Sequence, residues 1–168
     1  KKITKAMEMI AAVKMRKAVD AALKTRAYSR LTQDLLNHLA HLNEPDCPLL
    51  ETRPVQKILL IMISSNRGLC GSFNANIFKK TAKLIKDVKN ISRHRTVNDE
   101  EIPPTDKVEI EVLGLGRKSA FFAKKNNLKL VSVFDKLSEV PNYEESLTIS
   151  KMALKDFLAK NYDKVLVA

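Results

Sequence analysis

The stretch Lys57-Ile-Leu-Leu-Ile-Met-Ile-Ser64 decides the fold class of this 168-residue chain. It is short and apolar, which is typical of a strand buried on both faces of a parallel sheet. Further strands are expected at 108–113 and 128–134, and another begins at Lys164. Helical patterns separate them, at 72–89, 117–125 and 143–161. Strands that alternate with helices predict a Rossmann-like α/β domain with a mostly parallel sheet and flanking helices.

Upstream of this domain, residues 1–44 predict one long helix. They contain neither Gly nor Pro, and they are rich in Ala, Lys, Leu, Met and Arg, which favour helices. Apolar residues recur at helical spacing along two lines, Ile3, Met7, Ala11, Met15, Ala18, Ala22 and then Tyr28, Leu31, Leu35, Leu39, Leu42. At about 1.5 Å per residue, the helix would be roughly 60 Å long, about twice the width of a small domain.

A helix of that length needs a partner for its apolar lines, most simply a second helix in a coiled coil. No other helix of this length is predicted, so another chain or a further part of the protein must supply it. The opening residues are predicted as helix interior and the last as an unfinished strand, so we interpret the sequence as part of a longer protein. We divide it into a long helix (1–44), a linker (45–56) and an α/β domain (57–168).

The composition limits the classes of partner. Thirty basic and 19 acidic residues give a net charge of +11, which predicts nucleic acid, an anionic membrane surface or an acidic protein as the partner. A basic nucleic-acid-binding protein with a coiled-coil arm is one alternative, but aromatic residues are only 5% and no stacking or recognition motif is present. Cys47 and Cys70 favour a reducing compartment, a single disulfide between them being the less favoured alternative.

The loop Ser64–Asn74 is the sharpest local motif, and it lies between the first strand and the next helix. In nucleotide-binding folds this position holds a phosphate, because the helix N-terminus offers free N–H groups. A small α/β enzyme that binds a phosphate ligand here is therefore a second alternative. However, a Gly-Lys-Ser/Thr triplet is missing, and the spacing of Gly68 and Gly71 does not match the dinucleotide fingerprint.

Residues for catalysis or metal binding do not form a recognisable set. A catalytic Cys70 would need a histidine base, but the histidines are His38, His41 and His94, on the long helix or in a polar loop. His38 and His41 are three residues apart, and no third and fourth ligand are evident for a structural zinc site. We expect no catalytic residue, no cofactor and no metal, so the chain is not expected to be an enzyme by itself.

Two motifs in this order closely resemble the gamma subunits of F-type ATP synthases. The first, Lys2-Ile-Thr-Lys-Ala-Met-Glu-Met-Ile-Ala-Ala-Val-Lys-Met-Arg-Lys-Ala18, resembles the N-terminal helix of that family. The second, Ser64-Ser-Asn-Arg-Gly-Leu-Cys-Gly-Ser-Phe-Asn-Ala-Asn76, resembles its other signature. The resemblance is close over residues 1–80 and looser elsewhere, and the polar stretch 90–106 is longer than expected for bacterial members. It implies a C-terminal helix that winds antiparallel against the first helix.

The resemblance implies a central rotor shaft that couples proton flow across a membrane to ATP synthesis or hydrolysis in a ring of alpha and beta subunits. The implied partners are the alpha, beta and epsilon subunits and the membrane ring of c subunits, without nucleic acid. The implied location is peripheral, on the cytoplasmic face of a bacterial plasma membrane or the matrix side of a mitochondrial inner membrane. The subunit itself would regulate ATPase activity without catalysing it.

Candidate contact residues follow from the same resemblance, motif by motif. Those that would face the beta subunit are Lys14, Met15, Arg16 and Lys17 on the helix, and Arg67, Gly68, Leu69, Cys70 and Gly71 in the loop. Those that would lie near the c-ring are Thr25, Arg26, Tyr28, Arg30 and Leu31. Arg67 is expected to be steered toward an acidic surface by its charge.

Overall fold

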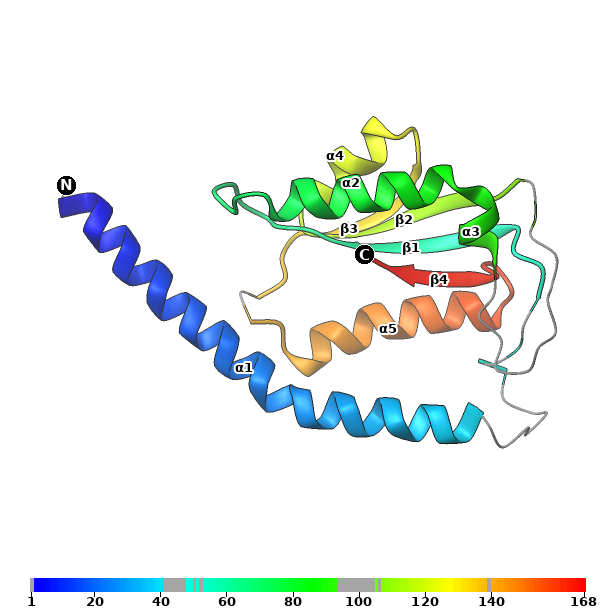
Figure 1. The fold of residues 1–168 in the computed structure, drawn as a ribbon, viewed down its shortest axis with the longest axis horizontal. Coiled ribbons are helices and arrows are strands. Elements are labelled where there is room, and N and C mark those ends of the chain that lie inside the picture. The colour runs from blue at the N-terminus through cyan, green and yellow to red at the C-terminus, as the bar shows by residue number, and fades with distance from the viewer. Residues whose placement is uncertain are drawn as a thin grey trace. The chain divides into compact units, whose positions relative to one another are not determined.

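The computed structural model describes residues 2–40, 48–49, 51, 53–93, 105, 107–138 and 140–168, with no side chain placed for residue 40. The chain divides into two compact units, which are treated separately below (Figure 1). One comprises residues 1–46 with 138–142, and the other comprises residues 47–137 with 143–168. The predicted boundaries at 44 and 45 lie outside the described residues.

The first unit is dominated by the helix α1, which runs without a break over Lys2–Ala40 (Figure 1). The prediction of one long helix is confirmed for these residues, whereas 41–44 lie outside the described part. Apart from the partly buried Ala21 and Thr32, its described side chains are exposed. The periodic apolar residues are therefore arranged along the helix without a partner among the described residues.

The second unit is built on a parallel sheet of four strands, β1 (Lys57–Ile63), β2 (Glu109–Leu115), β3 (Lys129–Phe134) and β4 (Lys164–Val167). The strand order is β3-β2-β1-β4, with β1 and β2 in the centre. All three strand pairs are parallel, as the alternation of strands and helices predicted. The α/β fold class is confirmed.

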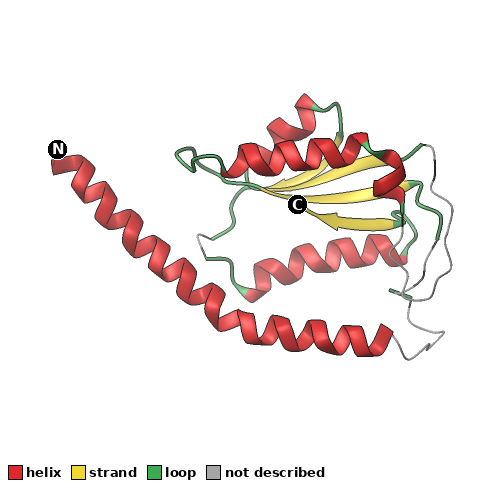
Figure 2. Cartoon of the chain, viewed as in Figure 1, coloured by secondary structure: helices red, strands yellow, loops and turns green. Residues whose placement is uncertain are grey.

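Helices cover both faces of this sheet (Figure 2). The helices α2 (Phe73–Lys86), α3 (Val88–Ser92) and α4 (Lys118–Lys125) lie on one face, and α5 (Tyr143–Leu158) lies on the other. Successive side chains of a strand point to opposite faces. Ile58, Leu60 and Met62 of β1 therefore join the core beneath α2 and α4, whereas Leu59 and Ile61 join the core beneath α5.

The helix predicted over 72–89 is wrong as a single element. It is interrupted at Asp87, whose backbone leaves the helical region with φ −94° and ψ 76°. The Asp87 side chain then accepts a hydrogen bond from the backbone N–H of Asn90 and caps α3. A short polar side chain that satisfies free N–H groups at a helix start competes with continuation of the preceding helix.

The strand predicted over 108–113 extends to Leu115 in the structure, so Gly114 lies inside β2. A Cβ atom on Gly114 would be 2.0 Å from the hydroxyl oxygen of Ser119, in the first turn of α4. The absence of a side chain lets α4 pack directly on the strand. The sequence pattern Leu113-Gly-Leu-Gly116 thus reflects close helix–strand packing as well as the turn that follows.

Candidate partner-binding site

The loop after β1 is fixed to the neighbouring strand at its first residue. The backbone N–H of Ser64 donates to the carbonyl oxygen of Leu115 at 2.7 Å, and its hydroxyl lies 3.1 Å from the carbonyl oxygens of Leu115 and Gly116. Gly116 has φ +90°, and a Cβ there would lie 2.1 Å from the Ser64 carbonyl oxygen. Only glycine fits this approach, so the loops after β1 and β2 leave the sheet together.

Asn74, in the first turn of α2, holds the inside of the loop. Its side-chain oxygen accepts from the backbone N–H of Ser65 at 3.0 Å, and its amide nitrogen donates to the Ser65 hydroxyl at 2.8 Å. The same nitrogen lies 3.0 Å from the sulfur of Cys70. The hydroxyl of Ser65 in turn donates to the carbonyl oxygen of Arg67 at 2.7 Å. The loop is thus braced by its own polar groups, which leaves its tip as the part available to a partner.

The tip of the loop presents one cation and one large apolar side chain to solvent. Arg67 is exposed, forms no ion pair with a described residue and is followed by the exposed Gly68. Leu69 is 98% exposed and has φ +62°, which is uncommon for a residue with a side chain. Gly71 also has a positive φ, +57°. The tip thus presents an arginine and, two residues later, a leucine whose backbone conformation is strained.

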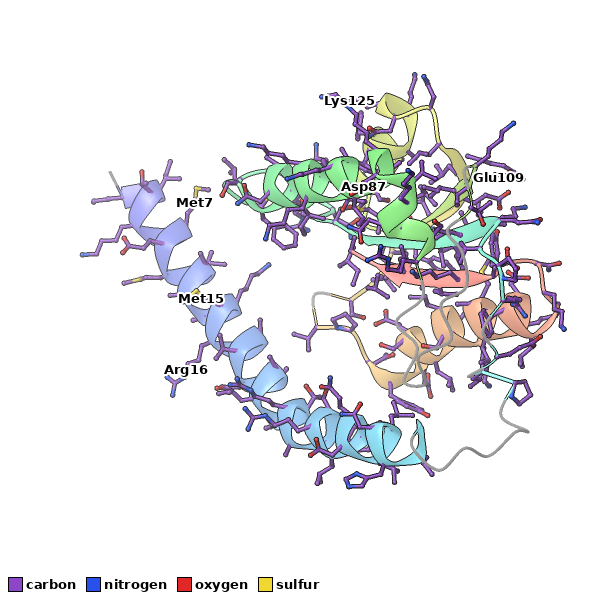
Figure 3. All side chains as sticks on the ribbon, turned by 45° about the vertical axis from the view of Figure 1, so that its right-hand side comes forward. Met7, Met15, Arg16, Asp87, Glu109 and Lys125 are labelled. Atoms are coloured by element: carbon purple, nitrogen blue, oxygen red, sulfur yellow. The ribbon has the colours of Figure 1, made fainter. Side chains whose placement is uncertain are left out.

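On α1, the candidate residues Lys14, Met15, Arg16 and Lys17 are all exposed, and Figure 3 labels Met15 and Arg16. Further along α1, the candidates Thr25, Arg26, Tyr28, Arg30 and Leu31 are exposed as well. The Thr25 hydroxyl donates to the carbonyl oxygen of Ala22 at 3.1 Å. The candidates for the beta-subunit contact on the helix and those for the c-ring contact thus all lie on α1. The loop candidates belong to the other unit.

The chemistry of the loop gives no support to a catalytic cysteine. Cys70 is a free, partly buried thiol that contacts Ser65 and Asn74. His38 lies on α1, where its ring Nδ1 is 2.7 Å from the carbonyl oxygen of Asp34, and His41 and His94 fall outside the described residues. No group of three or more His, Cys, Asp or Glu that could hold a metal ion occurs among the described residues.

A buried ionic cluster in the sheet unit was not predicted. Glu111 of β2 is only 3% exposed. Its carboxylate accepts from Lys129 Nζ at 2.7 Å and from the Tyr162 hydroxyl at 2.5 Å, and forms an ion pair with Lys57 Nζ at 2.9 Å. Burial alone would raise the pKa of Glu111, but these three hydrogen bonds outweigh it and hold the pKa at about 2.

The partners of Glu111 respond in the opposite direction. Burial and the hydrogen bond to Glu111 raise the pKa of Tyr162, and the hydrogen bond to Glu111 raises the pKa of Lys57. The charged state of the carboxylate and the protonated state of its donors therefore stabilise each other. Lysines at the starts of β1 and β3, beside an acidic residue in β2, were the only signal in the sequence for this cluster.

An open cavity of about 330 Å³ lies where β3 ends and α5 begins. It is mainly apolar, and its lining residues are Val133, Phe134, Asp135, Lys136, Leu137, Glu145 and Thr148. Asp135 at its rim is bound to Arg117 through a 3.1 Å ion pair. The cavity has no grouping of side chains for catalysis. No helix among the described residues is long and apolar enough to cross a membrane.

The structure thus combines a long solvent-exposed helix with a parallel α/β unit whose loop after β1 is exposed at its tip. The family model described as ATP synthase matches residues 1–168, so the chain belongs to the ATP synthase family. The resemblance to gamma subunits inferred from the two sequence motifs is confirmed by this match together with the relatives described next.

Similar proteins are named ATP synthase gamma chain and come from bacteria. The one from Amoebophilus asiaticus (strain 5a2) is 33% identical over 165 residues, covering 97% of this chain and 52% of the relative. One from Dehalococcoides mccartyi is 35% identical over 170 residues, covering 99% and 53%. One from Gloeothece citriformis (strain PCC 7424) is 29% identical over 168 residues, covering 98% and 49%. The chain spans about half the length of the curated relatives it matches.

Proposed function

We propose that this chain is part of the central rotor shaft of an ATP synthase, the gamma subunit. The observation that supports this most directly is the uninterrupted helix Lys2–Ala40 with its apolar residues exposed, in a chain whose relatives are gamma chains along the whole of its length. A shaft needs a long helix that a second helix can cover. The apolar lines of α1 meet that need.

In this proposal the subunit transmits force and does not catalyse. Proton flow would turn the membrane ring, the shaft would turn with it, and its asymmetry would give the nucleotide sites of the beta subunits unequal affinities. Such coupling is a free energy carried between distant sites by an element stiff enough to move as one body. An α1 paired with a second helix supplies that stiffness, and the α/β unit supplies an anchorage for rotation.

The proposed contacts with the beta subunit are Lys14, Met15, Arg16 and Lys17 on α1 and the loop Arg67–Gly71. All of these except the partly buried Cys70 are exposed. The Arg67 guanidinium, at the tip of a loop braced from within, suits an acidic surface that approaches from solvent. The proposed contacts with the c-ring are Thr25, Arg26, Tyr28, Arg30 and Leu31.

The remaining partners are proposed on the same basis. They are the alpha subunits, the epsilon subunit and the c-ring, with association to the membrane through the complex. The location that follows is peripheral, at the cytoplasmic face of a bacterial plasma membrane or the matrix face of a mitochondrial inner membrane. Bacterial relatives support the first of these two locations.

Assembly tests the proposal. The full-length subunit carrying this sequence is mixed with alpha and beta subunits from the same source, and the stoichiometry and ATP hydrolysis of the product are measured. One copy is expected per three alpha–beta pairs, and activity is expected to depend on it. If no complex forms, the shaft role is wrong. Salt-dependent nucleic-acid binding would then support the alternative of a basic nucleic-acid-binding protein.

The loop is tested by charge reversal. Arg67→Glu is expected to weaken rotation-coupled ATP synthesis while leaving the free energy of unfolding within about 0.5 kcal/mol, because the side chain is exposed. Lys155→Glu on α5 is the control, since it makes the same charge change on an exposed residue far from the loop in sequence. Equal effects of the two variants on coupling would remove Arg67 from the proposed contact.

A further inference from the structure

The outer surface of α2 and α4 is strongly basic. The two helices contain seven lysines and no acidic residue, within Phe73–Lys86 and Lys118–Lys125. Six of these lysines are exposed, and we call them the lysine face: Lys79, Lys80, Lys83, Lys86, Lys124 and Lys125. None of the six forms an ion pair with a residue that the structure describes.

The six lysines belong to one surface because α2 and α4 pack side by side on the same face of the sheet (Figure 1). The rings of Phe78 from α2 and Phe122 from α4 lie with their centroids 5.1 Å apart. Both side chains point into the core above the sheet, so the opposite sides of the helices face solvent. Lys125, labelled in Figure 3, lies at the end of α4.

The other face of the sheet has no such excess of charge. There α5 has Lys151 and Lys155 together with Glu144, Glu145 and Asp156. A general need for solubility would not leave the helices on one face without any acidic residue while the helix on the other face has three. The asymmetry indicates an anionic surface that meets the α2–α4 side of the unit.

The residue types distinguish between the classes of anionic partner. Protein interfaces are enriched in Arg and depleted in Lys, because the planar guanidinium forms bidentate pairs with carboxylates. Neither α2 nor α4 contains an arginine. Lysine keeps its hydration and acts as a point charge, which suits attraction to a layer of lipid headgroups. Clusters of four to eight basic residues on a helix are typical of such binding.

Apolar side chains lie among these lysines. Phe121 is 65% exposed on α4, with the ammonium of Lys118 5.3 Å from the centre of its ring. Leu84 of α2 is exposed and follows directly after Lys83. Basic residues interspersed with a phenylalanine and a leucine are the composition of helices that bind at a membrane interface.

We propose that the lysine face binds the anionic headgroups of a lipid bilayer. In this arrangement the ammonium groups contact the headgroup layer and Phe121 enters its apolar boundary. The contact is electrostatic, reversible and sensitive to salt. It is independent of the shaft role, since it depends on the surface of the α/β unit and not on α1.

Vesicle binding tests this directly. The chain is titrated with vesicles of phosphatidylcholine alone and with vesicles containing about one third phosphatidylglycerol. Binding to the anionic vesicles only, weakened by added salt, is expected. The variant Lys79→Gln/Lys83→Gln is expected to bind these vesicles roughly 25-fold more weakly. Its matched control, Lys151→Gln/Lys155→Gln, removes the same charge at the same spacing on α5, and is expected to stay within about twofold of the unchanged chain.

Two outcomes would overturn the proposal. One is an equal loss of vesicle affinity in the two double variants, which would mean that the net charge of the chain alone attracts it to the vesicles. The other is tight binding of soluble polyglutamate to the lysine face, with vesicles bound weakly or not at all, which would mean an acidic protein partner. Phe121→Ala provides a further distinction, because it is expected to weaken vesicle binding and to leave polyglutamate binding unchanged. Unfolding midpoints of all variants show whether each is folded.

Discussion

Two methionines show how differently the two units of this chain use apolar residues. Met62 in β1 is 0% exposed and lies in the core beneath α2 and α4, whereas Met15 on α1 is 70% exposed. Both residues belong to regular, uninterrupted elements. The central strands of the sheet unit bury their apolar side chains against the unit's own helices, whereas the apolar side chains along α1 are exposed.

The difference teaches that α1 and the sheet unit are specified by different physics. A helix needs only local propensity and hydrogen bonds between residues four apart, and 39 residues is well above the length at which isolated helices become marginal. A parallel sheet needs distant strands to meet, and it forms only with a core. The apolar side chains along α1 are thus not buried by the described residues.

The same substitution in the two units gives the largest contrast. Met62→Ala is expected to lower the free energy of unfolding by about 3 kcal/mol, because it removes buried atoms and leaves a cavity. Met15→Ala is expected to change it by less than about 0.5 kcal/mol, because the side chain is exposed and alanine favours helices. Urea unfolding followed by circular dichroism measures both.

Comparable losses of unfolding free energy in Met62→Ala and Met15→Ala would contradict this contrast, since they would mean that Met15 is buried in the chain in solution. Such a result would point to self-association through α1. Sedimentation of the unchanged chain at several concentrations would identify it.

The next largest effect is expected at Glu111. Glu111→Gln is expected to lower the free energy of unfolding by about 2 kcal/mol, because hydrogen bonds from Lys129, Lys57 and Tyr162 to a charged acceptor are replaced by weaker ones. Glu109→Gln, two residues earlier on the same strand and exposed, is the control and should change stability by less than about 0.5 kcal/mol.

The stabilisation by Glu111 is expected to depend on pH. The pKa of Glu111 is lowered in the folded protein to about 2 from an ordinary value of 4.5, so its contribution is complete above that ordinary value and is lost as the pH falls toward 2. The difference in stability between the unchanged chain and Glu111→Gln should therefore shrink over this range. A difference that stays constant would mean that the carboxylate charge is not what stabilises the cluster.

The sequence predicted the elements of both units far better than it predicted Glu111. The apolar run of β1 and the four-residue spacing in α1 are local patterns, and both were correct. Glu111 alternates with apolar neighbours, as an outward-facing residue of a strand would. It is buried because donors from β1, β3 and the segment before β4 converge on it, and no local pattern contains that convergence.

The candidate loop shows the same limit at smaller scale. Its glycines and its position after β1 could be recognised, and Gly71 does adopt a positive φ. The hydrogen bonds by which Asn74 connects Ser65 and Cys70 could not be predicted, since they depend on how the loop folds back on the helix. The role of Arg67–Gly71 as a contact stays a prediction.

A smaller effect is expected where α2 gives way to α3. Asp87→Ala removes the side chain that accepts from the Asn90 N–H, and should lower the free energy of unfolding by about 1 kcal/mol. Asp34→Ala, in the interior of α1, has no such cap to remove and should cost less than about 0.5 kcal/mol. If the two were equal, the interruption of the helix at Asp87 would owe nothing to capping.

The smallest effect in the chain alone is expected at Leu31, and it gives the most information about α1. Leu31 is 70% exposed, so Leu31→Ala should change the free energy of unfolding of the chain by less than about 0.5 kcal/mol. In the assembled complex that we propose, a partner that covers this position would raise the cost of the same substitution to about 2 kcal/mol or more, because a buried leucine would be truncated.

The cost of Leu31→Ala in the complex, minus its cost in the chain alone, therefore indicates how far Leu31 is buried on assembly. A Leu31→Ala complex that assembles and survives heating as well as the unchanged complex would show that Leu31 stays in solvent there. The apolar line from Tyr28 to Leu39 would then need a reason other than a covering partner, whereas a loss confined to the complex would identify α1 as the unit completed by other chains.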